Sequence, residues 1–139
     1  MDLKQFKTVE QLAAAIKSLD MVTSVAWTDY SGTSTIVGWT SYTIKKIFYK
    51  KIGKLVFVQF DIEGVSDDTV ATFTLPFSQQ ADLKLVKSAR AIDDGTPDIG
   101  FYTLAASAAI VTCYPDTAGS AWTGSGNKYV YGQFWYEIA

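Results

Sequence analysis

The 139-residue sequence predicts a mostly β domain: an antiparallel β-sandwich of jelly-roll-like form, preceded by a short N-terminal α-helix. Apolar residues recur with a helical period only near the N-terminus, and from about residue 22 they alternate as in strands. Short β-rich segments follow one another between stretches rich in Gly, Pro, Asp and Ser. Aromatic residues make up 14% of the chain, and they suit the half-buried surface of a sheet.

The N-terminal segment has the features of a helix over roughly residues 9–19. Thr8 and Gln11 have the spacing of a capping box. Three apolar residues share one face of this helix: Leu12, Ile16 and Leu19. A helix this short needs a partner for its apolar stripe. We therefore expect residues 1–21 to be an attachment or oligomerisation segment and residues 22–139 to form the β-sandwich domain.

The strongest local signal is a hairpin at Gly53, between β-rich segments 42–49 and 54–63. The second segment alternates strictly, which predicts one buried and one solvated face. The predicted inward residues are Val56, Val58, Phe60 and Ile62, and the predicted outward ones are Gln59, Asp61 and Glu63.

Further strands are expected over residues 69–75, 83–92, 100–105, 109–114 and 129–138. The turn-rich segments between strands are residues 63–68, 93–98 and 115–127. The last predicted strand has bulky residues on both faces. One face has Tyr129, Tyr131, Gln133 and Trp135, and the other has Val130, Phe134, Tyr136 and Ile138. Such a strand lies either between two layers or against a neighbouring subunit.

The sequence lacks the residues that the commonest catalytic sites need. It contains no histidine, which excludes a Ser-His-Asp triad, a His-ligated zinc ion and a histidine general base. Its single cysteine, Cys113, lies in an apolar segment and is expected to be a buried free thiol. No glycine-rich nucleotide-binding motif occurs. We therefore expect a protein that is not an enzyme and has no cofactor.

Two groups of carboxylates remain as alternatives. Asp61 and Glu63 could supply the pair that glycoside hydrolysis uses, but we expect them on the outward face of a strand. Asp93, Asp94 and Asp98 lie in a predicted turn, where Asp is common because it bonds nearby backbone amides. This turn could hold calcium, although its spacing matches no EF-hand. We expect no metal site.

The charge of the chain bears on its partners. A net charge of −2 argues against a nucleic-acid partner, which would require a basic face. One local run is basic: Lys45, Lys46, Lys50, Lys51 and Lys54. We interpret it as a solvated edge strand, and an anion-binding patch is the alternative. No apolar segment approaches membrane-spanning length, so we expect no membrane partner.

Four aromatic residues beside small polar residues are the candidate glycan-binding residues: Trp27, Tyr30, Trp39 and Trp122. Sugar-binding surfaces combine an aromatic ring, which meets the C–H face of a pyranose, with polar groups that bind its hydroxyls. The alternative is that each tryptophan fills the core or an interface between subunits.

The predicted hairpin also carries a family resemblance. Residues 49–58 (YKKIGKLVFV), 64–69 (GVSDDT) and 71–76 (ATFTLP) resemble β-domains of bacteriophage virions, as found in tail-fibre tips, receptor-binding proteins and head fibres. The likeness extends over roughly residues 27–138, and its motifs mark turns and core strands. It implies a jelly-roll-like sandwich that is often trimeric and is displayed on a virion. It implies no catalytic residue.

The leading expectation is therefore a phage virion structural protein: a head fibre, a decoration protein or a tail-tip component. Its expected partners are two further copies in a homotrimer, other capsid or tail proteins, and host-surface glycans. It would be made in the host cytoplasm and located in the virion. A stand-alone carbohydrate-binding module is the alternative, and a polysaccharide-degrading domain ranks third.

Overall fold

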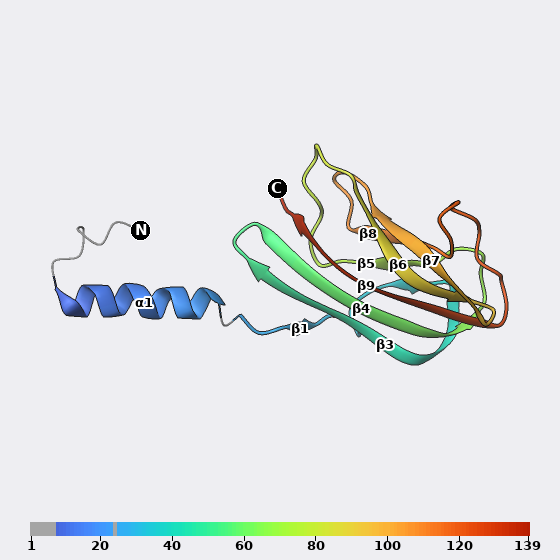
Figure 1. Ribbon diagram of the computed structural model, residues 1–139, viewed down its shortest axis with the longest axis horizontal. Helices are drawn as coiled ribbons and strands as arrows, with labels where there is room; N and C mark the ends of the chain where they lie inside the picture. The colour runs from blue at the N-terminus through green and yellow to red at the C-terminus, as the bar shows by residue number, and fades with distance from the viewer. Residues whose placement is uncertain (1–7, 24) are drawn as a thin grey trace.

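The computed structural model describes residues 8–23 and 25–139 (Figure 1). It confirms a mostly β chain with one short helix, and every strand pairing is antiparallel. The elements are α1 (Val9–Thr23), β1 (Thr28–Asp29), β2 (Ile36–Val37), β3 (Trp39–Ile52), β4 (Leu55–Ser66), β5 (Thr72–Thr74), β6 (Leu85–Asp93), β7 (Thr96–Leu104), β8 (Ile110–Tyr114) and β9 (Asn127–Glu137).

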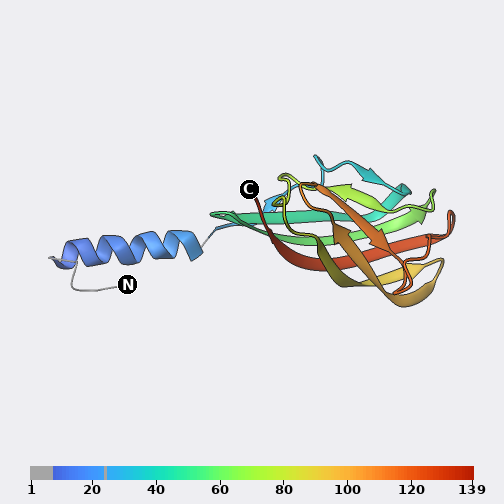
Figure 2. The ribbon, with the colours of Figure 1, turned by 90° about the horizontal axis from the view of Figure 1, so that it is seen from above.

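The nine strands form one hydrogen-bonded sheet in the order β1-β3-β4-β9-β6-β7-β8-β5-β2. Strands β5 to β8 lie in the order of a Greek key. The sheet curls strongly, as Figures 1 and 2 show. Its two edge strands, β1 and β2, are joined by residues 30–35 alone, so the chain passes from one edge to the other within a single short loop. The strands thus form one continuous curled sheet.

The hairpin at Gly53 is confirmed. Ile52 pairs with Leu55, and Gly53 has a φ of +59°, as a tight β-turn with glycine at its first central position requires. Strand β3 pairs with β1 only at Phe48 and Tyr49. The rest of β3 is therefore an edge of the sheet, in agreement with the interpretation of its lysines.

Two predicted turns are shorter than expected. Strand β4 continues through Gly64 to Ser66, because a residue without a side chain at 64 lets the β3 backbone approach closely: a Cβ there would lie 1.9 Å from the Ser41 carbonyl oxygen. In the 93–98 segment only Asp94 and Gly95 form the turn, and β7 begins at Thr96.

The core lies inside the curl. Phe60 on β4 is at its centre, with its ring centroid 4.8 Å from Phe73, 5.2 Å from Tyr102 and 6.3 Å from Phe134. These rings belong to β4, β5, β7 and β9, so aromatic contacts join both halves of the sheet. The predicted inward residues of the hairpin strand, Val56, Val58, Phe60 and Ile62, are all buried.

Helix α1 begins as predicted, since the Gln11 amide donates a hydrogen bond to Thr8 Oγ1 at 3.2 Å. It continues to Thr23, past the predicted segment boundary at residue 21. Leu12 is half-buried and Ile16 is 50% exposed, while the side chain of Leu19 lies outside the described part of the chain. Figures 1 and 2 show α1 projecting away from the β domain.

Candidate functional site

Two of the four candidate glycan-binding residues lie in the core. Trp39 is 6% exposed and Trp122 is 2% exposed, so neither ring offers a face to a ligand. The Trp39 indole N–H donates to the Lys128 carbonyl oxygen at 2.8 Å, and that of Trp122 donates to the Cys113 carbonyl oxygen at 2.8 Å. Both assignments as sugar platforms are corrected, and the core alternative holds for these two residues.

Both tryptophans surround Lys128, which is fully buried. Its Nζ lies 5.3 Å from the ring centroid of Trp39 and 5.4 Å from that of Trp122. The ammonium donates to the carbonyl oxygens of Asp68, Gly38 and Val70 at 2.6, 2.9 and 3.1 Å. Burial lowers the pKa of Lys128 to about 8, against the opposing effect of nearby carboxylates. This lysine joins β9 to the β2–β3 junction and to the loop after β4.

The third candidate, Tyr30, is a half-buried residue at the edge of the core. Its ring meets that of Tyr49 edge-on with centroids 6.0 Å apart, and Tyr49 in turn meets Phe77 at 5.8 Å. Tyr30 therefore also supports the core.

Trp27, the fourth candidate, lies on a different surface. It is 39% exposed, and Lys50 Nζ lies 4.7 Å from its ring centroid. Its ring lines a groove of about 330 Å³ together with Phe57, Gln133 and Trp135. The structure thus does not bring the four candidates together, and only Trp27 is placed where it could meet a ligand.

We call the surface of β3, β4, β9 and β6 that faces away from the core the outer face. The strand register places its side chains in three rows across the sheet. The aromatic row runs Lys50, Phe57, Trp135; the amide row runs Gln59, Gln133; and the charged row runs Lys46, Asp61, Tyr131, Arg90.

The aromatic row contains the most exposed large ring on this surface. Trp135 is 56% exposed, although it lies within the last strand, two residues before its end. Beyond it the surface continues into a second groove of about 330 Å³, bordered by Leu83, Val86 and Lys87. An exposed indole on a rigid strand is a suitable stacking surface for a flat apolar ligand face.

The amide row is held by a hydrogen bond from Gln59 Nε2 to Gln133 Oε1 at 3.3 Å. Both side chains are exposed. The bond fixes the two amides while leaving Gln59 Oε1 as an acceptor and Gln133 Nε2 as a donor. A donor and an acceptor next to each other match a pair of neighbouring hydroxyl groups, one accepting and one donating.

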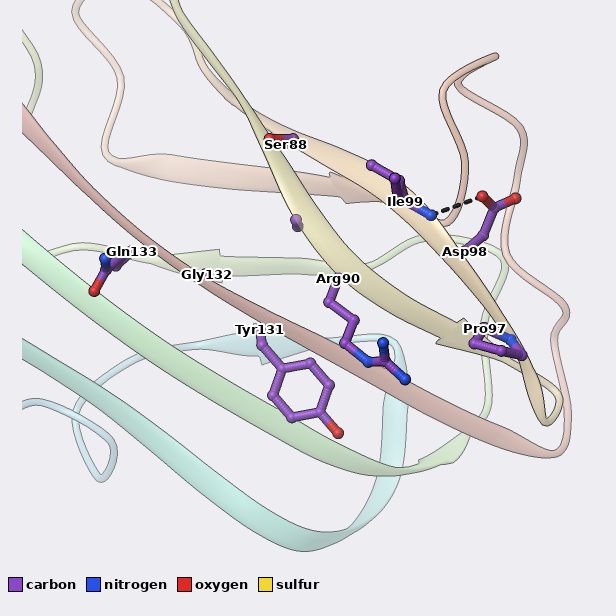
Figure 3. Close-up of a pocket in the computed structure, with 9 residues that line it drawn as sticks. Ser88, Arg90, Pro97, Asp98, Ile99, Tyr131, Gly132 and Gln133 are labelled. Carbon is purple, nitrogen blue, oxygen red and sulfur yellow. Dashed lines mark hydrogen bonds between the residues drawn. The ribbon is translucent and has the colours of Figure 1, made fainter.

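The charged row borders a wider groove of about 660 Å³, in which Arg90 and Tyr131 lie together with Pro97, Asp98 and Ile99 (Figure 3). This groove also includes Gln133, so it adjoins the groove at Trp27 and Trp135. The outer face therefore forms one extended depression along β9.

Three ionisable side chains at the charged row affect one another: Tyr131, Glu63 and Asp61. Tyr131 Oη donates to Glu63 Oε1 at 2.6 Å, and burial together with this bond raises the pKa of Tyr131. Burial, and then the nearby Glu63, raises the pKa of Asp61, whose Oδ1 is buried without a hydrogen-bond partner. Glu63 is thus occupied, and Asp61 is easier to protonate than an ordinary aspartate.

The sequence contained a signal for this surface. It placed Tyr131, Gln133 and Trp135 on one face of a strand whose other face was equally bulky. It could not tell which face would turn outward, and so it missed these residues as candidates. It also could not show that Gln59 would lie opposite Gln133, because the two are far apart along the chain.

The cysteine and the carboxylates of the turns interact with other parts of the fold. Cys113 is buried, and burial raises the pKa of its thiol. Asp93 accepts hydrogen bonds from the Thr123 amide and hydroxyl, and Asp116 accepts one from the Ser120 amide. Within residues 8–23 and 25–139, no three acidic or cysteine side chains are grouped so that they could hold a metal ion. No helix in the same ranges has the length and hydropathy to span a membrane.

No protein-family model and no curated protein sequence matches this chain. The geometry of the outer face and of α1 is therefore the basis for assigning a function.

Proposed function

We propose that the chain is a non-catalytic structural component of a bacteriophage virion, of the head-fibre, decoration or tail-tip type, whose β domain binds glycans of the host surface. The observation that carries the proposal is the outer face, where exposed Trp27 and Trp135 border the fixed amide pair of Gln59 and Gln133. On a rigid sheet, aromatic rings can stack on the C–H face of a pyranose while paired hydrogen-bonding groups bind its hydroxyls.

The proposal assigns binding rather than catalysis. The sequence has no histidine, and its only thiol is buried with a raised pKa. Asp61 and Glu63 lie beside Tyr131 on β4, and Glu63 accepts the hydrogen bond of that tyrosine. Asp98, which lines the larger groove, accepts the amide of Ile99. The outer face thus offers stacking and hydrogen bonding to a sugar.

Helix α1 supports the assembly half of the proposal. It extends away from the β domain, and Ile16 on its apolar stripe is 50% exposed (Figure 1). An isolated helix of this length is marginal in water, so docking on sister subunits or on another virion protein would stabilise it. We assign the stripe of Leu12 and Ile16 to this contact, in a homotrimer.

A glycan array tests the binding half. We expect the full chain to bind host-surface polysaccharides, and the double variant Trp27→Ala/Trp135→Ala to lose at least tenfold in affinity. The matched control is Tyr42→Ala, because Tyr42 is 38% exposed, has a lysine 5.3 Å from its ring centroid and lies off the grooves. Equal binding by the double variant and the wild type would overturn the site.

Light scattering coupled to size exclusion tests the assembly half. We expect the wild type to be a trimer and Leu12→Asp/Ile16→Asp to be a monomer. The control Ala14→Asp/Ser18→Asp adds the same charge on the opposite side of α1 and should leave the trimer intact. A wild-type monomer that binds glycans would instead favour a stand-alone carbohydrate-binding module, which would use the same outer face.

A further inference from the structure

The chain contains eleven lysines and a single arginine, Arg90, which lies on the outer face. It is opposite Tyr131 in the register of β6 and β9, and both side chains line the same groove (Figure 3). Arginine differs from lysine because its guanidinium group is rigid and planar and has five N–H donors. It can therefore form a bidentate pair of hydrogen bonds with a carboxylate or a phosphate.

The guanidinium group of Arg90 has all of its donors available. Within the part of the chain that the structure describes, it makes no hydrogen bond and no ion pair with another residue. None of the described acidic side chains near it is paired with it, and burial raises the pKa of Asp61, the acidic residue of the same row. Glu63 accepts the hydroxyl of Tyr131, and Asp98 accepts the amide of Ile99 at 2.7 Å. An incoming anion would therefore not have to displace an existing partner of Arg90.

The position of Arg90 also sets the length of the ligand. Arg90 pairs with Tyr131 in the register of β6 and β9, and Trp135 lies four residues further along β9 on the same face. At the usual rise per residue of a strand, the two positions are about 13 Å apart. A single sugar cannot reach both, whereas an oligosaccharide lying along β9 can.

We propose that the glycan bound by the outer face is acidic: Arg90 holds its carboxylate or phosphate group while another sugar of the same chain stacks on Trp135. This inference rests on the proposed glycan-binding function and names its ligand class. The amide pair of Gln59 and Gln133, which lies between the two ends, binds the hydroxyl groups of the intervening sugar.

Calorimetric titration of the full chain tests the proposal with three polymers. Polygalacturonate supplies carboxylates, its fully methyl-esterified form supplies the same backbone without charge, and a phosphomannan supplies phosphates on a chain of sugar rings. We expect at least tenfold tighter binding of one acidic polymer than of the ester, and the tighter of the two identifies the anion. Arg90→Gln should remove this preference. Arg90→Lys should retain only part of it, because an ammonium is a point charge and cannot form the bidentate pair.

The control is Lys54→Gln, which removes the same charge from the exposed hairpin turn, away from the grooves. It should bind like the wild type, which separates recognition by Arg90 from general attraction. Equal affinity for acidic and neutral polymers, or an unchanged preference in Arg90→Gln, would overturn the acidic ligand while leaving glycan binding intact. Absence of binding to all three polymers and to the array would overturn both proposals.

Discussion

The side-chain amide of Gln59 on β4 donates a hydrogen bond to that of Gln133 on β9 across 3.3 Å, in the middle of the exposed outer face. Two exposed glutamines lose side-chain entropy when they are fixed in this way. The pair is preorganised for a ligand, because the free acceptor and the free donor already lie side by side.

Gln133→Ala should therefore weaken glycan binding by about tenfold, since it removes the free donor and releases Gln59. Its free energy of unfolding should change by less than about 0.5 kcal/mol, because both side chains are at the surface. Titration and urea unfolding measure the two effects. A large loss of stability with unchanged binding would show that the pair serves the fold instead.

Lys128→Met should destabilise the protein by roughly 2–4 kcal/mol. The substitution keeps the length of the side chain and removes the buried charge, but three carbonyl oxygens, of Gly38, Asp68 and Val70, lose the ammonium as donor. Gly38 keeps the amide of Asp67 as a donor and Asp68 keeps the hydroxyl of Ser66, so the loss is most complete at Val70. Lys54→Met is the control at an exposed position and should change the free energy of unfolding by less than about 0.5 kcal/mol. Chemical denaturation gives both values, and equal stability of Lys128→Met and wild type would contradict this account of the buried ammonium.

The same lysine predicts a pH dependence. Its pKa falls from the ordinary 10.5 to about 8 in the folded chain. Between these values the unfolded chain binds more protons, so the free energy of unfolding should rise with pH. Cys113 acts in the opposite direction above pH 9, because burial raises its pKa. Denaturation between pH 7 and 9 should show wild-type stability increasing relative to Lys128→Met; a parallel pH profile for the two proteins would contradict the lowered pKa of Lys128.

Gly38→Ala should cost more than about 2 kcal/mol of stability. Gly38 has a φ of +110°, and a Cβ there would lie 2.1 Å from the Val70 carbonyl oxygen and 3.1 Å from Lys128 Nζ. Gly53→Ala separates the two causes, since Gly53 also has a positive φ but has no atom within 4 Å of its Cβ position. It should cost about 1 kcal/mol, from backbone strain alone. Thermal unfolding of both variants measures the difference, which should vanish if the close approach of the Val70 backbone to Gly38 plays no part.

Local patterns were sufficient to predict much of this fold. The alternation in residues 54–63 and the glycine at 53 predicted the β3–β4 hairpin and its buried face, because both depend on neighbours in the chain. The capping box at Thr8 likewise predicted the start of α1. The single curled sheet could not be predicted in this way, because it depends on pairings such as β4 with β9 between distant segments.

The candidate site was predicted only in part, for the same reason. Glycine, serine and threonine around Trp39 and Trp122 gave those segments the composition of a sugar-binding loop. Both rings are buried beside Lys128, whose partners are 58 to 90 residues away in the sequence. Of the four candidates, Trp27 is exposed and stays a candidate glycan-binding residue, and Trp135 was missed because β9 is bulky on both faces.

Radical oxidation of the tryptophans, read by mass spectrometry on the full chain, tests the role of the outer face most directly. Without ligand, Trp27 and Trp135 should be oxidised, while Trp39 and Trp122 should be protected by burial. A saturating glycan that the array identifies should protect Trp135 and Trp27 as well. Unchanged oxidation of both residues at saturation would place the ligand elsewhere and contradict the assignment of the outer face as the binding site.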